Sequence, residues 1–468
     1  MERERSKERE MEREMEIIGW FGSLDTMYEH LQVLPRLREK FGLNLIIPES
    51  SLWHTSGFKP SLHVEAINPL RDWIRQPGLL EHRRRHHLPE EAFPVLPGIL
   101  SGADDEKLWA LLKACKGYGI AVWGHFGVWS YGGELFPSYA LRDAHGHLPR
   151  KEYGRWGFGF CPSNQELLNW LEACLEDALK RYEIDGLFLD HARYPPPASF
   201  DSLFGCADAQ CLRLAEEEGV RLNHIITAEE VEEALKSYSP TKVVEFLESS
   251  PDFISFLSCL TSNASVSDWF DARCRILARQ MERLRSIASR SKGSSFPFGS
   301  DVFPPSIAYI AGHDVGRLSR ALNYSTGGFG PVVGWETAAL FAASSWAREI
   351  CSCVKGLEES KVLESIYRWL RLEGLGLRLP RTCNSIDEGI GIPTSDLLAL
   401  EFRRVAEDWG KRLRFYAPLS LRQGLEDLSR LFVILKEEGF KGVIFSGIDP
   451  EDPRQHEELR QVLGMKEL

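Results

Sequence analysis

Residues 182–197, YEIDGLFLDHARYPPP, contain the clearest sign of the fold in this chain. Its apolar run ends abruptly at Asp190, which is followed by His191, Arg193 and Tyr194 before three prolines. The prolines end the strand, because proline cannot take part in a central sheet ladder. Residues at the carboxyl ends of parallel barrel strands converge on the mouth of the active site. The segment therefore predicts a strand that delivers a carboxylate and its basic neighbours to a functional site.

Short apolar runs alternate with amphipathic stretches from about residue 16 onward. The candidate strands are residues 17–21, 43–48, 120–125, 184–190, 296–303, 323–333, 413–418 and 442–446. The helical stretches between them include residues 104–118, 164–182, 266–289, 335–354, 394–409 and 425–438. Repeated strand and helix units indicate a parallel sheet. Eight strands, with no GxGxxG or Walker loop after any of them, predict an α/β fold of the (β/α)8 TIM-barrel type.

Three segments are too long to be simple connections between elements: residues 50–100, 131–163 and 200–265. Long loops that follow barrel strands rise from the C-terminal face and shape the active site. We therefore expect one barrel domain over residues 16–450, with these insertions on its C-terminal face. Residues 1–15 are a charged N-terminal extension, and residues 451–468 form a C-terminal helix or tail.

The charge and hydropathy of the chain exclude several classes of partner. A formal net charge of -12 argues against nucleic acid, because proteins that bind polyanions usually present a basic face. No apolar run approaches the roughly 20 residues of a membrane span. The first sixteen residues, MERERSKEREMEREME, are charged where a signal peptide needs an apolar stretch. We expect a cytoplasmic protein that binds neither nucleic acid nor membranes.

The 10 cysteines are scattered along the chain. The closest pairs, Cys206 with Cys211 and Cys351 with Cys353, lack zinc-site spacing with matching partners. Buried free cysteines behave as small apolar residues. The sequence therefore predicts no metal site and no cofactor.

The run IDGLFLDHARYP, residues 184–195, resembles a strand motif, DGI-x-x-D-x-x-R-Y/F-P, of the glycoside-hydrolase-like TIM barrels of bacteria and archaea. FCPSN at 160–164 is similar to the segment before the preceding helix in those proteins, and GSDVFP at 299–304 to their next strand. Trp269 and Arg273 resemble the start of the intervening helix. The resemblance covers roughly residues 16–335 and implies a barrel that cleaves or transfers glycosidic bonds.

The sequence departs from that family at three places. His191 stands where the relatives more often have an acidic residue or tyrosine, Pro304 replaces a glycine, and the insertion at 200–265 is long. These differences affect the expected substrate more than the fold, because loops vary while the strands hold the carboxylates.

Cleavage of a glycosidic bond needs two carboxyl groups, one to donate a proton and one to act as nucleophile or to activate water. Asp190 is the first, although it could instead cap a helix or pair with Arg193. Asp301 is the leading candidate for the second, because it ends the strand after that of Asp190. It too could have another role, as a helix cap or as the partner of a nearby basic residue. Glu336 follows as an alternative, although a glutamate at a helix start often serves the helix dipole. Glu49 is a third candidate and otherwise a substrate-binding residue.

We expect Asp190 to be ionised, stabilised by Arg193, and to act as nucleophile or to stabilise an oxocarbenium ion. Asp301 follows an apolar strand and adjoins Phe303 and two prolines. Dry surroundings would raise its pKa, as a general acid requires.

Sugars stack their C–H faces on aromatic rings and hydrogen-bond polar side chains, so the expected substrate-binding residues are aromatic or polar. They are Glu49, Trp53, His125, Trp129, His191, Arg193 and Tyr194. His125 could equally be a core histidine. The expected partner is a carbohydrate; the sequence indicates neither the sugar nor the oligomeric state.

Two alternatives compete with the glycosidase. One is a metal-dependent barrel hydrolase that uses Asp190, His191, His125 and Glu49, because imidazole and carboxylate are common catalytic ligands. No HxH or HExxH spacing supports it. The other is a carbohydrate-binding protein without activity, which would lack a second carboxylate near Asp190.

Overall fold

The computed structural model describes residues 15–49, 52, 104–129, 139–148, 159–222, 224–329, 334–372 and 376–464. Eight parallel strands close into a barrel in the order of the sequence. They are β1 (Ile17–Ser23), β2 (Leu45–Glu49), β3 (Ala121–Gly127), β4 (Gly186–Asp190), β5 (Phe298–Val302), β6 (Tyr324–Gly327), β7 (Arg414–Ser420) and β8 (Gly442–Ser446). β1 pairs with β8 and closes the barrel. The predicted (β/α)8 fold is confirmed, and each candidate strand overlaps an observed one.

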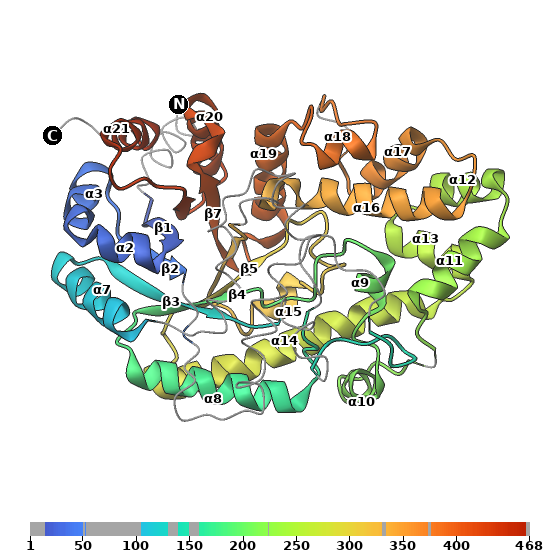
Figure 1. Ribbon diagram of the computed structural model, residues 1–468, viewed down its shortest axis with the longest axis horizontal. Coiled ribbons are helices and arrows are strands. Elements are labelled where there is room, and N and C mark those ends of the chain that lie inside the picture. The colour runs from blue at the N-terminus through green and yellow to red at the C-terminus, as the bar shows by residue number, and fades with distance from the viewer. Residues whose placement is uncertain are drawn as a thin grey trace, which may run out of the picture.

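One helix covers the outside of the barrel after each strand (Figure 1). In chain order these are α3 (Leu34–Phe41), α7 (Asp105–Tyr118), α8 (Gln165–Arg181), α14 (Ser265–Lys292), α15 (Val315–Leu318), α19 (Thr394–Arg404), α20 (Leu425–Glu437) and α21 (Pro453–Val462). α21 comes from the segment expected to be a C-terminal helix or tail, and it packs on α3 and α20. Shorter helical pieces are α2 (Leu24–Glu29), η1 (Leu31–Val33), η4 (Val405–Trp409) and η5 (Leu421–Gln423).

Capping residues set the ends of the outer helices. The side chains of Asp104 and Asn164 accept hydrogen bonds from backbone N–H groups in the first turns of α7 and α8. α7 ends at Gly119, whose φ of 68° is left-handed and suits glycine. The helices therefore begin and end where the sequence supplies the caps.

Alternate residues of the strands face opposite sides of the barrel wall. The interior is filled by a cluster of large apolar side chains: Phe21, Leu45, Ile47, Trp123, Phe188, Tyr324, Tyr416 and Ile444. Gly299 makes room for one of them, because a Cβ there would lie 2.4 Å from the ring of Tyr324. The Tyr324 hydroxyl donates to the carbonyl of Leu187 at 2.8 Å, which couples β6 to β4 across β5.

A second apolar core lies beside the barrel in a helical layer (Figure 1). Its helices are α9 (Phe200–Phe204), α10 (Ala209–Glu217), α11 (Ala228–Ser237), α12 (Pro240–Ser249), α13 (Phe253–Thr261), α16 (Ala338–Cys353), α17 (Glu359–Trp369) and α18 (Cys383–Asp387). The short η3 (Trp335–Thr337) precedes α16, and its Trp335 packs in the barrel cluster. The expected insertion at 200–265 is thus an ordered set of helices. The insertion at 50–100 lies outside the described residues apart from Leu52, and that at 131–163 is described only in part.

Trp346 of α16 joins the helical layer to the segment that follows β4. Its ring stacks on Phe253 with centroids 3.9 Å apart, and its Nε1 donates to the carbonyl of Pro197 at 2.7 Å. The carbonyl of Pro197, the last residue of the 182–197 segment, therefore holds the helical layer against the barrel through its hydrogen bond with Trp346. None of the helices that the structure describes combines the length and the apolar character needed for a membrane span.

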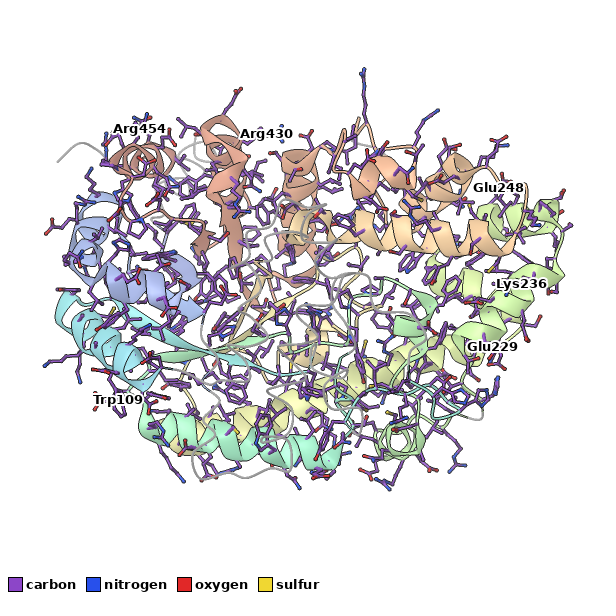
Figure 2. All side chains as sticks on the ribbon, in the orientation of Figure 1. Trp109, Glu229, Lys236, Glu248, Arg430 and Arg454 are labelled. Carbon is purple, nitrogen blue, oxygen red and sulfur yellow. The ribbon has the colours of Figure 1, made fainter. Side chains whose placement is uncertain are left out.

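The Trp346→Ala variant should lose about 3–5 kcal/mol of unfolding free energy, because it removes a fully buried ring and leaves a cavity. Urea denaturation followed by circular dichroism would measure the loss. Trp109→Ala is the matched control: Trp109 is 49% exposed and lies at the outer surface (Figure 2), so its removal should change stability little. Equal denaturation midpoints for the two variants would show that Trp346 does not hold the layer in place.

Candidate active site

Four titratable side chains point into the barrel mouth because of the period of the strands. Phe188 lies in the interior cluster, and Asp190, two residues later, faces the same side. The same spacing relates Ile47 to Glu49, Trp123 to His125 and Gly299 to Asp301. All four strands end at the same face of the barrel.

Asp190 and Asp301 lie side by side. β4 and β5 pair in parallel with Leu189 opposite Ser300, and one further step in this register brings Asp190 level with Asp301. Both carboxylates are buried, with 8% and 4% of their residue surfaces exposed. Two acidic side chains in so little solvent cannot both ionise freely.

His191 connects the two aspartates. Its Nδ1 lies 2.7 Å from Oδ2 of Asp190, and its backbone N–H donates to Oδ1 of Asp301 at 2.9 Å. Both contacts require the chain to turn sharply directly after Asp190, and His191 has a φ of 58°. This left-handed conformation is unfavourable for a residue with a side chain and is concentrated at functional sites.

Asp190 is held in its ionised form. Nε2 of His125 lies 3.0 Å from Oδ2 of Asp190, on the same oxygen that His191 approaches. Burial alone would raise the pKa of Asp190, but the charge of His191 and the contacts with both imidazoles outweigh it. The pKa of Asp190 therefore falls well below its usual value.

The pKa of Asp301 is shifted in the opposite direction from that of Asp190. Burial, and then the negative charge of Asp190, raise the pKa of Asp301 above its usual value, and Arg193 opposes them. Nε of Arg193 lies 3.6 Å from Oδ2 of Asp301, and its guanidinium sits 4.7 Å from the centre of the Phe303 ring. The expectation that Arg193 stabilises Asp190 is corrected, because the turn at His191 carries Arg193 to the neighbouring strand.

Glu49 and Glu336 differ in their relation to Asp190. Burial raises the pKa of Glu49, His125 lowers it, and Asp190 raises it further. Burial also raises the pKa of Glu336, on η3, and its own backbone amide opposes the shift. The Glu336 carboxylate folds against Gly334, where a Cβ would lie 2.3 Å from Oε1. Glu49 and Asp301 are thus the carboxyl groups on which the charge of Asp190 acts.

The aromatic residues expected to stack on sugars are placed differently from one another. Trp129 and Tyr194 are buried, at 0% and 1% exposure, so neither ring offers a free face for stacking. The guanidinium of Arg273 lies over the Tyr194 ring, 4.3 Å from its centre. Burial and then the charge of Cys206 raise the pKa of Tyr194 well above its usual value. Trp53 lies outside the described residues.

Two residues at the site were not found from the sequence. Phe329, shortly after β6, is partly exposed and stacks on Phe21 with centroids 4.5 Å apart. His313 joins two loops, because its Nδ1 accepts from the N–H of Phe303 at 3.0 Å and its Nε2 lies 3.3 Å from the carbonyl of Ala192. Burial lowers the pKa of His313 to about 3, so it is neutral. In the sequence, the only hint of a role for Phe329 is that an aromatic residue directly follows Gly327 and Gly328 at the end of a strand.

The described residues contain a group of three side chains whose potential metal ligands all lie within 4.8 Å of one another: Cys161, Cys206 and Cys211. The set formed by Asp190, His125, His191 and Glu49 does not form such a group. Within this set, the close contacts are those of the two imidazoles with Asp190.

The chain is similar to several solved structures that contain glycoside hydrolases. With the PgaB (BpsB) glycoside hydrolase domain of Bordetella bronchiseptica it shares a TM-score of 0.47 and 12% identity over 97% of this chain and 100% of that one. With the catalytic domain of β-amylase from Paenibacillus polymyxa the values are 0.45 and 11%, over 96% and 98%. With a β-galactosidase from Halorubrum lacusprofundi they are 0.46 and 9%, over 96% and 57%.

No protein-family model matches the sequence, and no curated protein does. The resemblance of residues 184–195 to a family motif therefore stays a prediction. The solved structures above are distant, and their named activities belong to those proteins. The contacts of Asp190 with His125 and His191 are therefore the main indication of what this chain does.

The raised pKa of Asp301 predicts that this residue lowers the stability of the protein at neutral pH. The folded state binds a proton on Asp301 more tightly than the unfolded chain, so ionising it costs stability above the folded pKa. The cost disappears as the pH falls below the unfolded value near 3.8. Asp301→Asn should therefore be more stable than the parent at about pH 7.5, with a smaller gain at about pH 4.

Urea denaturation at the two pH values would measure this difference. Glu437→Gln, at an exposed position of α20, is the control and should change stability little at either pH. If Asp301→Asn were less stable than the parent at both pH values, Asp301 would not have the destabilising effect predicted here.

Proposed function

We propose that this chain is a glycoside hydrolase in which Asp190 and Asp301 are the two catalytic carboxyl groups. The observation that carries the proposal is the opposite displacement of their pKa values at neighbouring strand ends. Two carboxyl groups whose surroundings push their pKa values apart are suited to act as base or nucleophile and as acid. Glycosidic cleavage needs that pair.

Asp190 is the ionised partner. With its negative charge held between His125 and His191, it can attack the anomeric carbon or stabilise the oxocarbenium ion that develops there. The two imidazoles also fix the direction of the carboxylate, which reduces the reorganisation needed in the transition state.

Asp301 is the partner that keeps its proton. The N–H of His191 donates to Oδ1, whereas Oδ2 has only the longer contact of 3.6 Å with Nε of Arg193, so Oδ2 is the oxygen better suited to carry the proton to the leaving group. Gly328 adjoins this oxygen: a Cβ there would lie 3.6 Å from Oδ2, and its absence leaves room for a ligand. Asp301 would then act as the general acid.

A carbohydrate is the substrate that these groups and the neighbouring rings support. Phe329 stacks on Phe21, and Phe21 in turn meets the His125 ring with centroids 6.1 Å apart. Phe329 also directly follows Gly328, which adjoins Asp301, and a partly exposed ring is suited to the apolar face of a sugar. We assign Phe329 to substrate binding in place of Trp129 and Tyr194.

Replacing Asp190 by asparagine should lower turnover by more than about 1000-fold, because it removes the negative charge at the reacting carbon. A panel of 4-methylumbelliferyl glycosides would first identify a substrate that the parent cleaves, and release of the fluorophore would then be compared. Asp185→Asn is the matched control: it lies just before the other end of β4, and its carboxylate accepts from the N–H of Val122, as an amide oxygen can. Turnover by Asp190→Asn within tenfold of the control would remove Asp190 from the mechanism.

The identity of the acid can be tested by leaving-group dependence. Asp301→Asn should impair cleavage of natural oligosaccharides and alkyl glycosides far more than cleavage of nitrophenyl glycosides, whose leaving groups need little protonation. Glu336→Gln should affect both kinds of substrate to a similar extent. If Glu336→Gln shows the selective loss and Asp301→Asn does not, the acid is Glu336.

A further inference from the structure

Three cysteines from two distant parts of the sequence meet in the core next to the active-site loop. Cys161 lies between β3 and α8, Cys206 follows α9, and Cys211 lies on α10. Their exposures are 2%, 1% and 0%. Cys161 and Cys211 are separated by 50 positions, so the three cysteines cannot be recognised as a group from their spacing in the sequence.

The sulfur atoms have the spacing that one small metal ion needs. Sγ of Cys161 lies 3.4 Å from Sγ of Cys211, and the three sulfur atoms all lie within 4.8 Å of one another. A tetrahedral zinc ion with Zn–S bonds of about 2.3 Å holds its sulfur ligands about 3.8 Å apart. Small side-chain movements would bring the three sulfur atoms to that geometry.

We propose that Cys161, Cys206 and Cys211 bind a zinc ion with a structural role. Soft thiolate ligands select zinc over the hard cations magnesium and calcium. A disulfide is a poorer interpretation, because it would join two of the sulfur atoms and leave the third beside them unpaired. Binding releases the thiol protons and leaves three thiolates around a divalent cation.

The backbone around the cysteines supports a site that joins three segments. The N–H of Cys161 donates to the carbonyl of Tyr139 at 2.9 Å, and the N–H of Ala207 donates to that of Arg142 at 2.8 Å. Cys206 has a left-handed φ of 62°, a strained conformation that a metal–sulfur bond would help to maintain. The ion would thus fasten the segment between β3 and α8 to the start of the helical layer.

Tyr194 relates this site to the proposed active site. It belongs to the same apolar cluster as the three cysteines, and its buried hydroxyl has no hydrogen-bond partner among the residues that the structure describes. Its ring supports Arg273, which donates to the carbonyl of Leu203 at 2.8 Å, three residues before Cys206. The ion would therefore position the loop that carries His191 and Arg193, without contacting the substrate.

Metal content measures the proposal directly, independently of any glycosidase activity. The full chain, expressed without a histidine tag in medium supplemented with zinc, should contain about one zinc per chain by inductively coupled plasma mass spectrometry. Cys211→Ala should lower bound zinc more than about tenfold, because a ligand is lost. Cys174→Ala is the matched control: Cys174 is equally buried on a helix, α8, and its removal should leave the zinc content unchanged.

A second measurement does not depend on a folded variant. Replacing the metal of the parent protein by Co²⁺ should produce the sulfur-to-cobalt absorption in the near ultraviolet and the visible bands of a tetrahedral site. X-ray absorption at the zinc edge should give three sulfur ligands and one lighter atom. The proposal is overturned by a chain that takes up no stoichiometric zinc under reducing conditions, by iron in its place, or by a disulfide between Cys161 and Cys211 in non-reducing peptide mapping.

Discussion

The negative charge of Asp190, held between two imidazoles, is the interaction on which the rest of the site depends. His125 and His191 approach the same carboxylate oxygen from two sides, at 3.0 and 2.7 Å. Burial raises the pKa of the neighbouring Asp301, and the charge that the imidazoles stabilise on Asp190 raises it further. One buried charge therefore adds to the upward shift of a second pKa, and the barrel contributes by placing both residues at adjacent strand ends.

The fold could be predicted because its signals are local. Each strand is a short apolar run, each outer helix is amphipathic, and the caps at Asp104 and Asn164 mark where helices begin. The inward direction of Asp190 and Asp301 also follows from the alternation of side chains along their strands. These features depend on near neighbours in the chain, which a single sequence displays.

The contacts within the site could not be predicted in the same way. The partner of Arg193 depends on the left-handed turn at His191, which is unusual for a histidine and leaves no mark in the sequence. The burial of Tyr194 depends on packing against Arg273, far along the chain. The cysteine group is a similar case: two of its members are close in sequence, and the third comes from another loop. An unusual backbone turn decided the first of these outcomes, and long-range packing decided the other two.

The helical layer has a consequence for how the chain is made. Its core combines α9–α13, which precede β5, with α16–α18, which follow β6. During synthesis the first group leaves the ribosome before its partners exist, so apolar side chains such as Phe253 and Phe256 must wait for Trp346 and Trp369. Exposed apolar surface of this kind favours association with other chains until it is covered. Residues 200–265 alone would therefore carry only part of the apolar core of this layer, and the rest arrives after β6 has been synthesised.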